Sequence, residues 1–156
     1  MTHRRLAVAA FLTFLSMSCF SVAMAHDNGT HRIESKNSPA DTMNKLEAMV
    51  KEKGFHVFAR IDHAAGAKSI DKDLRPTELL IFGNPKGGTV LMSCDQQIGL
   101  DLPLKFLVWQ DEQGKTWISY NEMEHFAKRY GLKGCGAPVV KNVENILELM
   151  ATVASK

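Results

Sequence analysis

Apolar and polar positions follow two spacings along the chain, and each change of spacing marks an expected element. Apolar residues three and four apart predict amphipathic helices, because that spacing places them on one helix face. Apolar residues at every second position, or on both strand faces, predict strands. In chain order we expect a helix from Pro39 to its stop at Gly54, a strand at 55–61, a short helix or ordered loop at 62–73, a strand at 77–82, a short helix around 90–96, a hairpin of 104–110 and 115–120, a helix opened by Asn121 with Glu124 and stopped by Gly131, and a last helix after Pro138.

Hairpin-linked strands with helices at either end are typical of an α+β fold, here an antiparallel sheet flanked by helices in a single compact domain. The strand at 77–82 is apolar on both faces, so we expect it to be central and covered on both sides. The strand at 104–109 shows the same pattern. Because a small domain has few helices for a second sheet face, we expect part of that face to be covered by another copy, as a homodimer.

The first 25 residues are expected to be a signal peptide. Arg4 and Arg5 precede an apolar run at 6–20, and Ala-Met-Ala supplies the small residues before the cleavage site. An alternative makes Cys19 a lipoprotein cysteine, but Ser16 stands where that motif has Leu. The run is shorter than the ~20 residues of a membrane helix. We therefore expect a periplasmic or secreted protein with no membrane span in its mature form.

The mature chain has the length of one domain. Residues 26–38 form a polar segment in which 31–36 can pair as an edge strand, and 39–156 form the folded domain. The whole chain carries 19 basic and 17 acidic residues, so loss of Arg4 and Arg5 leaves equal numbers and no net charge. Nothing resembles the basic stripe of a nucleic-acid-binding protein, and we expect no nucleic-acid partner.

Polar side chains gather at the ends of two expected strands, where a binding site is usually built. Asp62 and His63 end one strand, Arg75 enters the next and Asn84 leaves it. Arg75 and Asn84 bracket a strand about 20 Å long, so we expect Arg75 to stay with Asp62 and His63. A small-molecule or anionic ligand is expected in this cleft; the candidate ligand-binding residues are Asp62, His63, Arg75, Glu78, Asn84, Asp101 and Lys105.

Two other functions compete with ligand binding. An imidazole beside a carboxylate suits acid–base chemistry, so one alternative is a hydrolase or isomerase with His63 as its base. We favour Asp62 as the N-cap of a following helix, because adjacent helical residues point apart. The other alternative is a purely structural dimer. Residues 83–89 either cradle an anion or form a turn, and the turn is favoured because the Gly-Lys-Ser/Thr ending of a nucleotide loop is missing. The sequence requires no cofactor.

The remaining candidates are a metal pair and a disulfide. Cleavage after residue 25 exposes His26 as an N-terminus whose amine and imidazole can chelate copper, with His31 as a third ligand. Cys94 and Cys135 are the only mature thiols, and an oxidising compartment favours a disulfide between them. Free thiols and an intermolecular bridge stay open as alternatives.

Four segments together resemble the DUF302 family, a domain of unknown function: 59–67, 74–86, 100–105 and 117–121. The resemblance covers roughly residues 33–150. It implies a TATA-binding-protein-like α+β fold, an antiparallel sheet flanked by helices that is often dimeric, and it implies no DNA binding. Fold does not confer function. This chain departs from the usual family pattern by carrying Cys94, Cys135 and a signal peptide.

Overall fold

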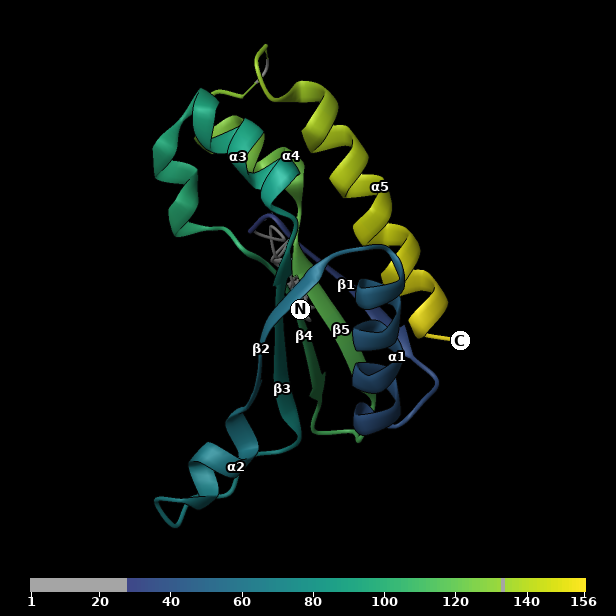
Figure 1. Ribbon diagram of the computed structural model, residues 1–156. Coiled ribbons are helices and arrows are strands. Elements are labelled where there is room, and N and C mark those ends of the chain that lie inside the picture. The colour runs from purple at the N-terminus through teal and green to yellow at the C-terminus, as the bar shows by residue number, and fades with distance from the viewer. Residues whose placement is uncertain (1–27, 133) are drawn as a thin grey trace, which may run out of the picture.

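A computed structural model of the chain describes residues 28–132 and 134–156 (Figure 1). The predicted signal peptide and His26 lie outside these residues. The elements in chain order are β1 (Thr30–Ser35), α1 (Pro39–Glu52), β2 (His56–Asp62), α2 (His63–Lys68), β3 (Thr77–Gly83), α3 (Pro85–Cys94), the 3₁₀ helix η1 (Gln96–Leu100), β4 (Leu104–Gln110), β5 (Thr116–Asn121), α4 (Met123–Arg129) and α5 (Ala137–Ala154).

The five strands form one antiparallel sheet in the order β1-β5-β4-β3-β2. Strands β4 and β5 are the predicted hairpin, whose turn ends on Gly114 with a φ of 79°, a left-handed conformation that favours glycine. The first strand pairs with β5 along its whole length and forms one edge of the sheet. The expected α+β class, an antiparallel sheet with flanking helices in one domain, is confirmed.

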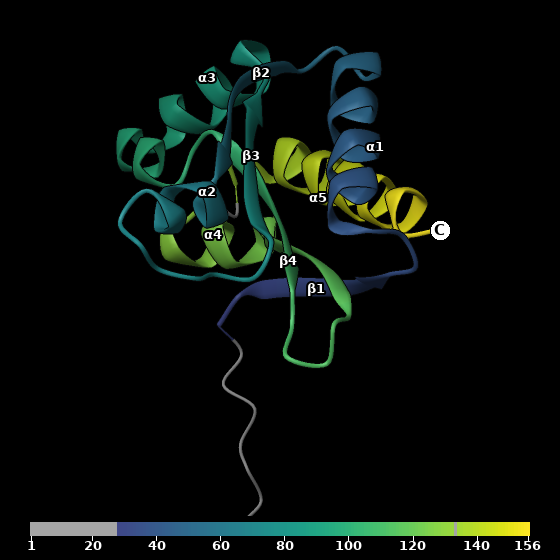
Figure 2. The same ribbon diagram turned by 90° about the horizontal axis from the view of Figure 1, so that it is seen from below.

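Helices α1 and α5 lie on one side of the sheet in both views (Figures 1 and 2). The core fills the space between them and the strands. Its fully buried side chains include Leu80 and Phe82 of β3, Phe106 and Val108 of β4, Ile118 of β5, Met43, Leu46 and Val50 of α1, and Leu147 and Met150 of α5.

The first helix forms where the sequence predicts it. Ser38 is the N-cap, and its side chain accepts a hydrogen bond from the Asp41 amide at 3.1 Å. Pro39 occupies the first turn, where its missing N–H costs nothing. Gly54 takes a φ of 76° just beyond the end of the helix.

The opposite side of the sheet is half-buried and carries no helix over its centre. Cross-strand partners share a face, and this open face presents Leu79, Ile81, Leu107, Trp109 and Trp117. Helices α2 and α3 flank it at opposite ends (Figures 1 and 2). The prediction that β3 is central is correct, but within the described part of the chain helices cover one face only.

The predicted alternation of the 55–61 strand is wrong in one respect. A register shift between Val57 and Ala59 interrupts the pairing of β2 with β3, as a β-bulge does. The bulge reverses the faces, so Ala59 and Ile61 lie on the open face instead of joining Val57 toward the core. Phe58, at the bulge, is 59% exposed.

Two helices begin differently from the prediction. Asn84 accepts a hydrogen bond from the Lys86 amide at 3.0 Å, so α3 begins at Pro85, and the favoured turn at 83–89 is wrong. At α4 the expected cap by Asn121 is missing; Glu122 is the N-cap residue, and its side chain accepts no capping hydrogen bond. The carboxylate of Glu144, on α5, accepts the bond from the Met123 amide instead.

Candidate functional site

Four of the predicted site residues lie at one end of the sheet, beside α2, but they make separate contacts. Asp62 caps α2 by accepting a hydrogen bond from the Ala65 amide at 2.9 Å. The Arg75 guanidinium donates to the carbonyl oxygen of Gln110 at 3.1 Å. The His63 imidazole has no hydrogen-bond or ion-pair partner in the described part of the chain. The carboxylate that an acid–base pair would place on His63 therefore serves a helix end.

Glu78, directly opposite Asp62 in the sheet register, belongs to a charged network on the helix-covered side. Its carboxylate accepts from the Nε and Nη2 atoms of Arg60, the second at 3.0 Å. The same guanidinium donates to Glu47 at 3.1 Å. Hydrogen bonds from Lys51 and then Arg60 hold the pKa of the Glu47 carboxyl below its usual value. This network ties β2 and β3 to α1.

Asp101 and Lys105 tie the η1 segment to its neighbours. The Asp101 carboxylate accepts from the Tyr130 hydroxyl at 2.6 Å and from Arg129 at 3.1 Å. The Lys105 ammonium donates to the carbonyl oxygens of Asp101 and Pro103 at 2.9 and 2.7 Å. Burial lowers the pKa of Lys105. Both side chains are thus engaged with the protein itself.

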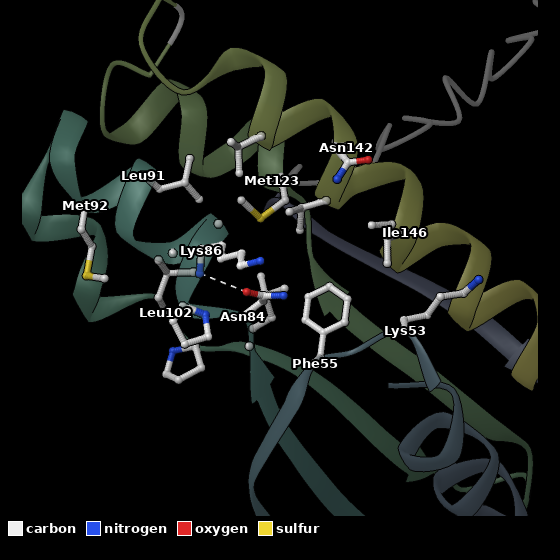
Figure 3. Close-up of a pocket in the computed structure, with 18 of the residues that line it drawn as sticks. Lys53, Phe55, Asn84, Lys86, Leu91, Met92, Leu102, Met123, Asn142 and Ile146 are labelled. Atoms are coloured by element: carbon white, nitrogen blue, oxygen red, sulfur yellow. Dashed lines mark hydrogen bonds between the residues drawn. The ribbon is translucent and has the colours of Figure 1, made fainter. Parts of the chain in front are cut away.

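A cleft opens at the other end of the sheet and holds a cavity of about 650 Å³ (Figure 3). Five parts of the chain line it: the segment after α1, the end of β3 with α3, η1 with the start of β4, the start of α4, and α5. The lining residues are Lys53, Phe55, Phe58, Gly83, Asn84, Pro85, Lys86, Gly87, Gly88, Leu91, Met92, Gly99, Leu102, Pro103, Leu104, Met123, Pro138, Val139, Asn142, Val143 and Ile146. Of the seven predicted ligand-binding residues, only Asn84 is among them.

The walls of the cleft are mainly apolar, and its polar side chains are two lysines and two asparagines. Asn84 caps α3, and its amide nitrogen lies 3.5 Å from the Gly54 carbonyl oxygen. Lys86 and Lys53 carry the only charges of the lining, and within residues 28–132 and 134–156 neither ammonium has a partner. As far as the structure describes the chain, the lining contains no Asp, Glu, His, Cys, Ser or Tyr.

The disulfide predicted between Cys94 and Cys135 is present, and it joins two walls of the cleft. It connects the last residue of α3 to the segment just before α5, with Cα atoms 5.8 Å apart. Gly136 lets the two walls approach, because a Cβ there would lie 2.9 Å from a Leu91 methyl group. Leu91 lines the cleft from α3, and Val139 faces it from α5.

One carboxylate holds the start of α4, which lines the cleft. Glu144 accepts the hydrogen bond from the Met123 amide at 2.5 Å, and Met123 lines the cleft. Burial raises the pKa of Glu144, while its bonds to the amides of Met123 and Glu124 oppose that rise. Glu144 is therefore a positioning residue for the start of α4.

The predicted copper ligands stay a prediction. His26 lies outside the described residues. His31, on β1, lies 3.8 Å from the Glu122 carboxylate, and its ring centroid is 5.3 Å from that of Tyr120. Across the described ranges, no three His, Cys, Asp or Glu side chains are grouped so that they could hold a metal ion.

Comparison with known proteins identifies a family but no activity. Residues 31–150 match the model of the family described as Domain of unknown function DUF302. The structure is similar to the crystal structure of the uncharacterized conserved protein DUF302 from Bacillus stearothermophilus, with a TM-score of 0.72 and 18% identity. That similarity covers 83% of this chain and 99% of the other. At this identity the likeness shows the fold alone.

Curated relatives carry a more specific name. The chain is 47% identical over 106 residues to proteins named Fluoride-specific ion channel FluC 1 in Brucella suis biovar 1 (strain 1330) and Brucella abortus biovar 1 (strain 9-941). The match covers 68% of this chain but 42% and 39% of those proteins. This chain thus spans about two fifths of the length of these relatives. Of the helices in the part of the chain described here, none is long and apolar enough to cross a membrane.

Proposed function

The chain belongs to the DUF302 family, and because that description assigns no activity, we propose a function from the cleft: the protein binds a small organic molecule with an apolar body. The observation that carries this proposal is the cavity of about 650 Å³ with apolar walls and a few polar side chains. That volume lies within the range of small-molecule sites, which are mostly apolar with few orienting polar groups.

Binding is favoured over acid–base catalysis by the composition of the lining. General acid–base work uses groups such as His, Asp, Glu, Tyr or Lys within hydrogen-bond reach of the reacting atoms. Among the described residues the lining holds only two of these groups, the exposed lysines Lys53 and Lys86, and no carboxylate, imidazole or phenol to act with them. His63, the proposed base of the alternative hydrolase or isomerase, belongs to the α2 end of the sheet and is not a lining residue.

Replacing Asn142 with Trp is expected to weaken binding of the neutral dye N-phenyl-1-naphthylamine at least tenfold. Asn142 is an exposed residue of α5 that lines the cleft, so an indole there occupies ligand space without entering the core. The dye fluoresces in apolar surroundings, and its Kd follows from a fluorescence titration. Lys141→Trp, next to it on α5 but outside the lining, is the matched control.

Two outcomes would contradict the cleft as the dye site. One is wild-type affinity in Asn142→Trp; the other is an equal loss in Lys141→Trp. The open face is a second apolar surface, so the same titration with Leu107→Glu distinguishes the two surfaces. We expect Leu107→Glu to keep the dye affinity.

The name of the Brucella relatives raises fluoride binding as a second possibility, and the cleft does not favour it. Fluoride is a small, strongly hydrated ion, and removing its water is costly unless several polar donors surround it closely. The four polar side chains of the lining come from three separate parts of the chain, and most of the lining is apolar. Fluoride is therefore a suitable control ligand in the dye titration, and we expect it to leave the dye bound.

We infer that the chain is exported and matures at His26, with 26–38 as a polar segment that contains the edge strand β1 and 39–156 as the domain. The pattern of two arginines, an apolar run and Ala-Met-Ala supports this inference. N-terminal sequencing of protein from the periplasmic fraction is expected to begin at His26. A sequence beginning at Met1, or a lipid on Cys19, would contradict it.

We also infer that the protein is a homodimer in solution, with the open faces of two copies packed together. Five apolar side chains of the open face come from three adjacent strands, which supports a shared interface. The same patch on each copy can form a two-fold contact.

A further inference from the structure

We propose that the cleft ligand is an amphipathic anion, an aliphatic or aromatic body with one anionic head, and that Lys86 holds the head. This inference rests on the proposed function and adds the charge of the ligand to it. The apolar walls of the cleft favour a ligand with an apolar body, and the two unpaired lysines favour an anionic head group on that ligand.

The charge of the lining has one sign. Its two charged residues are Lys86 and Lys53, and no carboxylate of the described residues lines the cleft with them. Figure 3 shows the Lys86 side chain extending into the cavity beside Asn84. Both lysines are exposed, so water and salt partly screen them. An ammonium at the edge of an apolar cavity still attracts an anionic head and repels a cationic one.

Within the residues that the structure describes, neither lysine of the lining is engaged by another side chain or a carbonyl oxygen of the protein, unlike two neighbouring lysines. The Lys51 ammonium lies 2.6 Å from a Glu47 oxygen, and the Lys105 ammonium donates to two carbonyl oxygens. Lys86 and Lys53 have no such contacts among the described residues. A ligand head therefore does not have to displace a protein carboxylate from either ammonium.

A small inorganic anion fits this cleft less well than an amphipathic one. The first turn of α3 is already capped by Asn84, which accepts the bond from the Lys86 amide at 3.0 Å. The remaining lining is dominated by side chains such as Leu91, Leu102 and Met123. These side chains offer an inorganic ion no hydrogen bonds, but they can bury the hydrocarbon body of a larger molecule.

The test is displacement of N-phenyl-1-naphthylamine by three ligands with nearly equal alkyl chains and different heads: decanoate, decanol and decyltrimethylammonium. We expect decanoate to bind at least tenfold more tightly than decanol, and the cation to bind most weakly. Added salt is expected to weaken the binding of decanoate but not that of decanol, because salt screens the attraction between charges. Decyl sulfate is expected to behave like decanoate.

Lys86→Gln is expected to lower the affinity for decanoate about tenfold, the smallest loss expected for one charge-assisted hydrogen bond. The same variant should keep wild-type affinity for decanol and for the neutral dye, which also shows that the cleft is intact. Lys53→Gln is expected to have a smaller effect on decanoate. Lys72→Gln, in the segment after α2 and outside the lining, is the matched control.

The outcomes separate the two proposals. The proposal of an anionic head group is overturned if decanoate and decanol bind with equal affinity. It is also overturned if Lys86→Gln leaves the decanoate affinity unchanged, and in either case the ligand of the cleft is a neutral apolar molecule. Failure of the wild-type protein to bind the dye and all three ligands overturns the proposed function itself. Should Lys86→Gln fail to bind the dye, Lys86→Met and the salt titration of the wild type decide the question.

Discussion

Protein in which Cys94 and Cys135 are both replaced by serine is expected to lose about 4 kcal/mol of unfolding free energy relative to the oxidised wild type. The two cysteines are 41 residues apart in sequence. In the chain-entropy model, a cross-link over that distance removes freedom from the unfolded chain worth about 4 kcal/mol. Urea unfolding of the oxidised wild type, the reduced wild type and the double variant measures the loss.

The same variant is expected to bind the neutral dye more weakly, because the disulfide joins the α3 wall of the cleft to the start of α5. Without it, α3 and η1 can move away from α5. Single replacement of either cysteine should reproduce the loss of stability, and reduction of the wild type should match the double variant. Equal unfolding midpoints for oxidised and reduced protein would contradict the stabilising role. Two free thiols in protein isolated under non-reducing conditions would contradict the bond itself.

Local sequence signals predict the elements whose ends are determined by neighbouring residues. The start of α1 at Ser38 and Pro39 and the β4–β5 hairpin before Gly114 need only interactions within a few positions. The amphipathic stripe of α5 is also local: Val143, Leu147 and Met150 at helical spacing are buried, whereas Val153 near the end of the helix is 46% exposed. The Cys94–Cys135 pair is predictable because few cysteines leave few pairings.

The errors come from interactions between distant parts of the chain. The α4 start is held by Glu144, twenty-one positions after Met123, and no capping motif near Asn121 reveals that bond. The bulge in β2 depends on pairing with β3, so the alternation of the strand alone cannot show which face Ala59 and Ile61 take.

The candidate site was harder to predict than the fold. Polar residues at strand ends were the predicted site, but near α2 they do not share a pocket: Asp62 caps a helix, Glu78 pairs with Arg60, and Arg75 donates to a carbonyl oxygen. Asn84 lies at the other end of β3, as the length of the strand requires. The cleft is lined by apolar residues from five separate parts of the chain, which in sequence look like ordinary core. The glycines of 83–88 were the available signal, since small residues leave open space beside a strand end.

The largest expected change of assembly comes from Leu107→Glu, which we expect to convert the homodimer to a monomer at micromolar concentration. Leu107 lies in the middle of the open face, opposite Leu79 on one side and Ser119 on the other. In a face-to-face dimer, two new carboxylates would be buried at the interface without partners, a cost of several kcal/mol. In a monomer the half-buried side chain can still reach water.

Sedimentation velocity of the wild type and the variant measures this change. Leu149→Glu is the matched control, because Leu149 is 49% exposed on α5 and lies away from the open face. We expect it to remain dimeric. A wild type that sediments as a monomer at micromolar concentration would contradict the dimer. A Leu107→Glu variant that remains dimeric would show that the interface is not the open face. In that case the protruding segment around α2, where Ile70 is 69% exposed, is the next surface to test.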